Sequence, residues 1–352
     1  MKQREKTDGL KLSDKSADVL CKLFTDLLDN ASAAKWQKPW MGGERLQVMN
    51  LKHKKPYNGF NAFLLEWACY SQGWKTPFFL TLDQVKQMGL RVNRTTNDEG
   101  EDVAEGYTPV FKWIPRYVNY LTGERVTDKD LAEMTEEERE NVVTRFSLRV
   151  FAEYNIDQTN LKELHPEQYD KYVALAKGLL QGCKHDANVS DATLDYILTT
   201  EGAWRCPIKH SEEDGAYYSP KADFIHLPNR TQFFKANDYY STALHEMAHS
   251  TKKVPTMSRD YGKKHWGDTG YATEELVAEL TSAIVAHDLG LEKTIDEQHI
   301  AYVNSWRQAI KDKDILRVII DDIMRCVRYE LNHYNKVTAL LAKRTAKAQI
   351  AA

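Results

Sequence analysis

Two histidines four residues apart, His245 and His249, enclose a glutamate, Glu246, that directly follows the first of them. Residues four apart on an α-helix lie one turn apart on the same side, so both imidazoles can bind one ion. Tetrahedral zinc with an open position takes such ligands. Glu246 lies about 100° further around the helix, near enough to take a proton from a metal-bound water. The H-E-x-x-H pattern therefore predicts a hydrolytic zinc centre, although another divalent metal would also fit.

The residues around these histidines have the pattern of a buried helix. Apolar side chains recur at three- and four-residue spacing and form one stripe beside the histidines. The stripe consists of Tyr240, Ala243, Leu244, Met247, Ala248 and Thr251. The pattern favours a helix packed against a core over the alternative, a surface helix with two solvated histidines.

A catalytic zinc usually needs a third protein ligand, and residues 271–280 offer carboxylates for it. Glu275 and Glu279 share one face of a predicted helix, so one can bind the metal while the other orients a ligand histidine. Glu274 lies on neither position, and we expect it to stabilise the helix start through the helix dipole. An ordinary acidic surface face is the alternative interpretation of this segment.

Length and composition limit the class of protein. With 352 residues and 42% hydrophobic composition, the chain can bury a sizeable core and is expected to form two domains. An odd count of 5 cysteines without a C-x-x-C pair predicts reduced thiols in the cytoplasm. We expect no transmembrane helix, because no run of about 18 apolar residues occurs, and no signal peptide at the charged N-terminus. A net charge of −3 excludes a wholly basic nucleic-acid binder, so any DNA site must be local.

Aromatic and basic residues interleave in the N-terminal half. Aromatic rings could stack with bases, and cations could pair with phosphates, as single-strand binding requires. The candidates for stacking are Trp36, Trp40, Tyr57, Trp74 and Phe78, and the candidate cations include Lys52, Lys54, Lys55 and Arg91. The alternatives are that the tryptophans fill a core and that the lysines belong to a solvated loop.

Several elements follow from sequence periodicity. Residues 107–114 and 146–154 are predicted to form paired strands, with a charged insertion at 127–143 between them. Residues 91–105 are polar and lack a period, which predicts a loop. Residues 161–188 are interpreted as a hydrophilic linker with a short helix. Three strands, the last at 223–227, then precede the H-E-x-x-H helix, and this last strand is expected to border a cleft that His226 could face.

The motifs also resemble those of a known family, the ArdC-type antirestriction proteins of mobile elements. In the C-terminal half the resemblance rests on H-E-M-A-H, the following Ser258-Arg259, and Y-A-T-E-E-L-V-A-E-L. In the N-terminal half it rests on W-x-x-P-W from Trp36 to Trp40, Y-N-G-x-N from Tyr57 to Asn61, and V-F-A-E-Y-N-I-D-Q-T. These motifs occur in the family's order over nearly the whole chain.

The resemblance implies an α+β fold: a single-stranded-DNA-binding domain at residues 1–160, a linker at 161–190 and a zincin-like metallopeptidase domain at 191–352. E-x-x-A-E is similar to the zincin pattern in which the first carboxylate, Glu275, binds the metal and the second, Glu279, accepts a hydrogen bond from a ligand histidine. Asn58 and Asn61 join the candidate DNA-binding residues through Y-N-G-x-N. The implied function is antirestriction through non-specific binding of single-stranded DNA; the alternative is an active zinc peptidase with a protein substrate, directed by its DNA-binding domain.

Overall fold

The computed structural model describes residues 16, 18–23, 25, 44–96, 100–182, 190–233, 235–254, 257–261, 269–291 and 312–351. Helices and strands mix along the chain, and the α+β class predicted from the sequence is confirmed. No helix among the described residues is both long enough and apolar enough to cross a membrane.

The N-terminal half is built on a six-stranded sheet in the order β3-β2-β4-β9-β7-β8. Helix α2 (Gly59–Gln72) covers it and buries 10 of its 14 residues. Helix α3 (Leu82–Gln87) begins at a capping box, in which Thr81 and Gln84 satisfy each other's backbone N–H groups. The strands are β2 (Met49–Asn50), β3 (Lys55–Pro56), β4 (Phe78–Thr81), β7 (Thr108–Asn119), β8 (Arg125–Val126) and β9 (Val142–Asn155).

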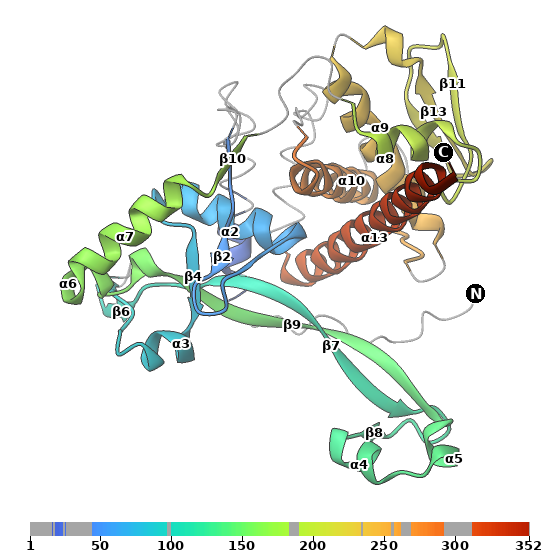
Figure 1. The fold of residues 1–352 in the computed structure, drawn as a ribbon. Coiled ribbons are helices and arrows are strands. Elements are labelled where there is room, and N and C mark those ends of the chain that lie inside the picture. Colours follow the sequence, from blue (N-terminus) through green and yellow to red (C-terminus); the bar gives the residue numbers. More distant parts are fainter. Residues whose placement is uncertain are drawn as a thin grey trace.

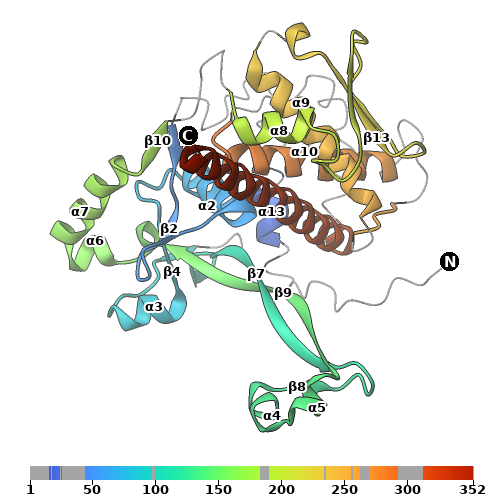
Figure 2. The same cartoon turned by 45° about the vertical axis from the view of Figure 1, so that its right-hand side comes forward.

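A long two-stranded ribbon extends from this sheet. Strands β7 and β9 pair antiparallel from Thr108 opposite Glu153 to Asn119 opposite Val142, which confirms the predicted pairing. The ribbon reaches away from the body and carries β8, α4 (Asp128–Glu133) and α5 (Glu136–Arg139) at its tip (Figures 1 and 2). The charged insertion therefore forms a separate module at the end of a β-ribbon.

The loop predicted at residues 91–105 is wrong in part. Strands β5 (Arg94–Thr96) and β6 (Asp102–Ala104) pair antiparallel there, and Arg94 Nε lies 2.6 Å from Asp102 Oδ2. Gly100 adopts a φ of 82°, which suits a turn between them. Both strands are largely exposed, so they lack the alternation of apolar and polar residues that marks a half-buried strand.

The predicted linker contains α6 (Leu161–Leu164), α7 (Pro166–Lys177) and β10 (Leu180–Gly182), which pairs with β1 (Glu44–Leu46). Leu161 and Tyr169 are buried in one cluster with Phe78 of β4. Residues 161–182 thus pack on the N-terminal half. The domain limits at residues 160 and 190 stay a prediction.

The C-terminal half packs a small sheet on the H-E-x-x-H helix, α9 (Ala236–Ser250). Strand β13 (Phe224–Pro228) lies between β11 (Ile208–Ser211), which is parallel to it, and β12 (Tyr217–Ser219), which is antiparallel. It is the central strand, and both ring nitrogens of His226 lie within hydrogen-bonding distance of sheet neighbours, Ser211 Oγ at 2.8 Å and the Gly215 carbonyl at 2.6 Å. The expectation that His226 faces a cleft is therefore wrong. The remaining helices are α8 (Ala192–Thr199), α10 (Thr269–Asp288) and α13 (Lys313–Ala351), with 3-10 turns at Ile156–Gln158, Arg230–Gln232 and Thr251–Lys253.

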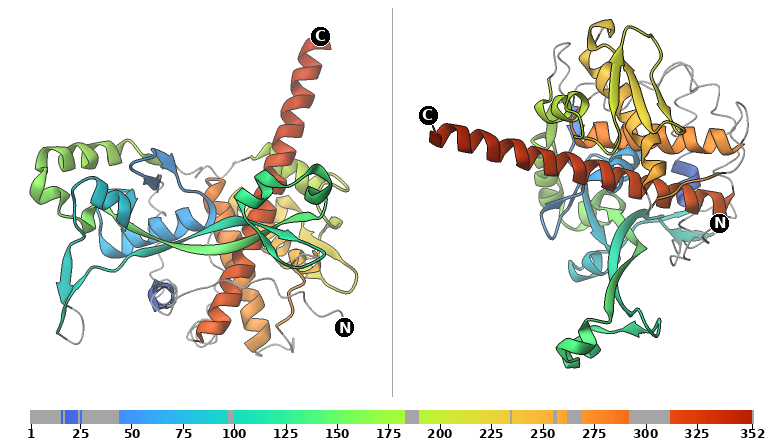
Figure 3. Two further views of the ribbon diagram at one scale, coloured as in Figure 1. Left: turned by 90° about the horizontal axis from the view of Figure 1, so that it is seen from below. Right: turned by 90° about the vertical axis from the view of Figure 1, so that its right-hand side faces the viewer.

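Helix α13 joins the two halves. It crosses the molecule in contact with α8, α10 and α2, and its last turns project beyond the body (Figures 2 and 3). One apolar cluster contains residues of all these helices, including Phe60 and Trp67 of α2, Leu276 of α10 and Ile320 and Ile323 of α13. The two halves consequently share a hydrophobic core.

Candidate metal centre

Helix α9 places its two histidines on one side, facing α10. Twelve of its 15 residues are buried, because the apolar stripe packs into the core while the histidines line its edge. The side chains of His245 and His249 keep only 11% and 10% of their surface exposed. Both imidazoles are thus held in a nearly enclosed space between the two helices.

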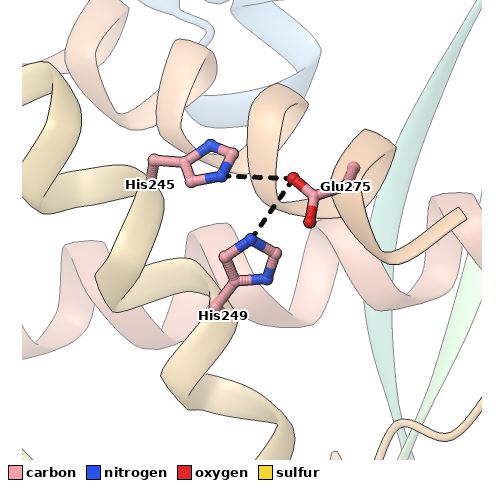
Figure 4. A group of neighbouring side chains, drawn as sticks. All are labelled: His245, His249 and Glu275. Atoms are coloured by element: carbon pink, nitrogen blue, oxygen red, sulfur yellow. Dashed lines mark ion pairs between the residues drawn. The ribbon is translucent and has the colours of Figure 1, made fainter. Parts of the chain in front are cut away.

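Glu275 of α10 completes a group of three converging side chains (Figure 4). Its Oε2 lies 3.5 Å from Nε2 of His245 and 3.5 Å from Nε2 of His249. The three candidate ligand atoms all lie within 4.8 Å of one another. Two imidazole nitrogens and a carboxylate oxygen are a donor set that zinc accepts, with a fourth position left for water. The residues present therefore fit a divalent cation.

The opposite nitrogen of each histidine faces a second carboxylate. His245 Nδ1 lies 3.1 Å from Glu279 Oε2, and His249 Nδ1 lies 3.2 Å from Glu274 Oε1. With the proton on Nδ1 donated to these carboxylates, each Nε2 is left with a lone pair directed at the common centre. The predicted hydrogen bond between Glu279 and a ligand histidine is present.

Glu274 does not act where the sequence analysis expected. The first turn of α10 contains no acidic residue, so Glu274 cannot stabilise the helix start through the dipole. It lies further along the helix, on the side that faces His249 and the buried guanidinium of Arg259. The sequence predicted a helix over residues 271–280, which put Glu274 near its start. The helix begins earlier, at Thr269, so Glu274 lies beyond its first turn.

Arg259 is a residue that sequence reasoning did not identify as part of the site. Its side chain has 0% of its surface exposed, and its guanidinium donates to both carboxylate oxygens of Glu274 at 2.9 and 3.2 Å. It also donates to the Ala248 carbonyl at 3.0 Å and to Thr251 Oγ1 at 2.6 Å. Arg259 therefore links the end of α9 to α10. Ser258 before it has a φ of 36°. The Ser258-Arg259 pair that follows H-E-M-A-H in the sequence was the signal that could have identified Arg259.

The charges of the site depend on one another. Burial would lower the pKa of His245, but hydrogen bonds to Glu275 and Glu279 outweigh burial and raise this pKa to about 10. The same balance, with Glu274 and Glu275 as the partners, raises the pKa of His249. Burial opposes ionisation of Glu274, yet Arg259 and His249 hold its pKa well below the usual range, and both histidines do the same for Glu275. The carboxylates of Glu274 and Glu275 are thus ionised and can bind a cation or a protonated imidazole.

The candidate DNA-binding residues are spread over the N-terminal half. Lys52 and Lys54 are exposed on the turn between β2 and β3, and Lys55 is exposed at the start of β3. Arg91 is also exposed, and its Nη2 lies 3.6 Å from Glu163 Oε2. Trp36 and Trp40 lie outside the described residues. Phe78 is 1% exposed and packs in the core, so it offers no face for stacking. Trp74 and Tyr57 are half-buried.

Two asparagines of the Y-N-G-x-N motif mark the start of α2. Asn58 is exposed and makes no side-chain cap hydrogen bond. Asn61 instead bonds the backbone of β7, donating to the Phe111 carbonyl at 2.7 Å and accepting from its N–H at 2.8 Å. Asn61 therefore fixes α2 to the sheet, while Asn58 faces solvent.

Comparisons with known proteins agree with this architecture. Residues 18–152 match the N-terminal domain of anti-restriction factor ArdC, and residues 194–320 match a zincin-like metallopeptidase. The chain is 32% identical over 295 residues to a DNA primase TraC of Escherichia coli and 33% identical over 293 residues to a second one. These alignments cover 83% and 81% of this chain but only 25% and 18% of those proteins, so the chain spans a quarter of their length or less.

Solved structures show the same fold. The metal-free crystal structure of the antirestriction ArdC protein from plasmid R388 superposes with a TM-score of 0.56 at 23% identity, over 91% of this chain and 98% of that one. Its Mn(II)-bound structure gives a TM-score of 0.55 at 23% identity, over 90% and 98% of the two chains. The ArdC N-terminal domain at residues 18–152 precedes the zincin-like metallopeptidase domain at residues 194–320, and the fold is that of the ArdC protein, so the chain is an ArdC-type protein in its two-domain architecture.

Proposed function

We propose that this chain is a metal-binding antirestriction protein that binds single-stranded DNA without sequence preference. The observation that carries the metal-binding part is the convergence of His245, His249 and Glu275, each histidine having its second nitrogen at a carboxylate. The Mn(II)-bound structure of the plasmid R388 protein, which has the same fold, supports a divalent cation. Zinc suits two imidazoles and a carboxylate best.

The residues around the proposed cation have separate tasks. Bound there, the cation would polarise a water molecule and lower its pKa. His245, His249 and Glu275 hold the cation, and Glu279 fixes the orientation of the His245 ring. Glu246, buried on α9 directly after His245, is the group that would accept a proton at its carboxylate. The near-enclosure of these side chains excludes bulk water from the centre.

The DNA-binding part rests on the ArdC N-terminal domain at residues 18–152 and on exposed cations beside aromatic residues. Phosphates would pair with cations such as Lys52, Lys54 and Lys55, and bases would stack on aromatic rings. Binding of this type lacks sequence preference, because every base has a face to stack and every nucleotide carries a phosphate. We also propose that the protein acts in the cytoplasm.

Metal content and DNA binding test the proposal together. The purified protein should hold close to one divalent ion per chain by elemental analysis, and His245→Ala and His249→Ala should each lose most of it. Wild type should bind single-stranded DNA more tightly than duplex, with an affinity that falls steeply with salt. Binding that ignores salt, or a preference for duplex, would contradict the DNA-binding part.

A second candidate, an active metallopeptidase with a protein substrate, is favoured by the presence of Glu246 beside the full set of ligands. Glu246→Gln separates the two because it removes the proton acceptor and leaves all three ligands in place. Entry of unmodified plasmid DNA into a restricting host would be measured with each variant. Protection equal to wild type would assign antirestriction to DNA binding; loss of protection with intact DNA binding and metal content would assign it to hydrolysis.

A further inference from the structure

A groove of about 400 Å³ lies at the junction of the two halves of the molecule. Its walls come from the start of α2, from β7, from the end of α10 and from α13, and Figures 1 and 2 show these elements meeting beside the root of the β7–β9 ribbon. The volume falls within the range of roughly 300–1,000 Å³ that is typical of ligand sites. None of the H-E-x-x-H residues lines it.

The walls carry cations and amides. Lys112 of β7 and Arg328 of α13 are exposed at the groove, as are the amide side chains of Asn58, Asn332 and Asn335. Of the described lining residues only Asp288 has a carboxylate, and its Oδ1 already accepts a hydrogen bond from the Gly59 N–H at 2.8 Å. The groove is thus cationic, with amides that can pair with the edges of nucleobases.

An aromatic ring of β7 lies against two cations of α13. The indole of Trp113 on β7 lines the groove, and the guanidinium carbons of Arg325 and Arg328 lie 5.8 Å from its ring centroid. An arginine plane on an aromatic ring is a surface on which a base can stack, and its charge can reach the adjacent phosphate. One groove therefore offers amides for the base edges, an aromatic ring for a base face and cations for the phosphates.

The groove is held rigidly by contacts across the two halves. Asn61 bonds β7 through Phe111, and Asp288 of α10 bonds the first residue of α2, so both walls are fixed to α2. Gly59 adopts a φ of 55°, which allows its N–H to reach Asp288, and a side chain there would be strained. Loops do not define the groove; its lining residues lie almost entirely on helices and a strand.

We propose that this groove binds a segment of single-stranded DNA and that α13 supplies one of its walls. The proposal rests on the DNA binding proposed above and locates it, since Arg328, Asn332 and Asn335 lie beyond both matched domains, at residues 18–152 and 194–320. Bases in a duplex are paired and stacked, so their faces cannot reach Trp113 in a groove of this size. The DNA site is consequently composite, formed by both halves together and not by the N-terminal half alone.

Salt-dependent binding by the full chain tests this placement. The probe is a fluorescein-labelled oligothymidylate about 15 nucleotides long, within the span such sites cover. Lys112→Ala and Arg328→Ala should each weaken binding and reduce the slope of log K against log salt by about 0.7, and Arg328→Lys should restore the slope. Lys343→Ala, which removes an exposed charge from α13 outside the groove, is the matched control and should leave the slope unchanged.

The amides provide a second, charge-free test. Asn332→Ala with Asn335→Ala should weaken binding severalfold without changing the salt slope, because no phosphate contact is lost. Oligonucleotides that carry 5-iodouracil should crosslink to the peptide that contains Trp113 on irradiation. A wild type without affinity for single-stranded DNA would reject the proposed function. A wild type that binds, with groove variants no weaker than Lys343→Ala, would reject only the groove.

Discussion

His287, in the last turn of α10, forms a buried hydrogen bond with Glu66 in the middle of α2. The two side chains are 3% and 7% exposed, and Glu66 Oε1 also accepts a hydrogen bond from the Leu46 N–H at 2.8 Å. Glu275, Glu279 and His287 are separated by multiples of four residues, and they give α10 two functions along its length. One part of the helix faces the metal centre, and its end fastens the N-terminal half.

Breaking this pair should destabilise the whole molecule. His287→Ala leaves Glu66 Oε2 buried without this hydrogen-bond partner, which costs about 1–3 kcal/mol of unfolding free energy. Replacing both residues by leucine removes both buried polar groups together and should recover most of the loss. Chemical denaturation of wild type, His287→Leu, Glu66→Leu and the double leucine variant forms a double-mutant cycle that measures the coupling. Additive losses in the cycle would show that the pair does not join the halves.

The convergence of His245, His249 and Glu275 could be predicted from the sequence because much of its geometry is local. The spacing of His245 and His249 fixes their positions on a helix, and the same holds for Glu275 relative to Glu279. Arg259 and the role of Glu274 could not be predicted, because they depend on how the segment after α9 returns to α10. That return involves residues far from any periodic pattern.

The same limit applies to the N-terminal half. Phe78 and Trp113 are both aromatic residues of strands. Phe78 is buried in the core, whereas Trp113 lines a groove. The groove requires α13, which begins at Lys313, almost 200 residues after β7 ends at Asn119. No local sequence pattern predicts a contact between β7 and α13. Of the candidate DNA-binding residues, Asn58 and Asn61 line the groove, whereas the lysines at 52, 54 and 55 do not.

The three glutamates of α10 should rank differently in metal binding. Glu275→Ala removes a proposed ligand and should lower metal affinity most. Glu279→Ala removes only the acceptor for the His245 Nδ1–H, and losses of that kind are about 10–100-fold. Competition with a chromophoric chelator gives both affinities. A larger loss for Glu279→Ala than for Glu275→Ala would reverse the assignment.

Metal affinity should rise with pH. Without a bound cation the pKa of His245 is raised to about 10, so at neutral pH a proton occupies this imidazole and must leave before a metal binds. Each released proton makes the affinity increase about tenfold per pH unit between about pH 6 and pH 9. Chelator competition across this range gives the slope, and a flat profile would contradict the prediction.

The stability of the metal-free protein should change in the opposite direction. A folded-state pKa above the unfolded value of His245 contributes stability that is fully present below about pH 6.5 and is lost as pH rises through about 10. Thermal unfolding in the presence of a chelator should therefore give wild type a lower midpoint at pH 9.5 than at pH 6.5. The corresponding loss of unfolding free energy is roughly one to a few kcal/mol and should exceed the loss for His245→Gln.

The last prediction concerns Arg259, which we expect to position His249 through Glu274. Lysine at this position keeps the charge but cannot donate at once to both Glu274 oxygens, the Ala248 carbonyl and Thr251. Arg259→Lys should therefore lower metal affinity by about 10–100-fold, as the loss of support for a ligand histidine does.

Lys252→Met is the matched control for Arg259→Lys. Lys252 Nζ lies 3.7 Å from the same Glu274 oxygen, so its removal takes away a neighbouring positive charge without disturbing the guanidinium bonds. If the geometry of Arg259 matters, Lys252→Met should change metal affinity far less than Arg259→Lys at equal folded fraction. Equal losses would mean that Glu274 responds to the total charge around it, and that the arginine does not orient His249.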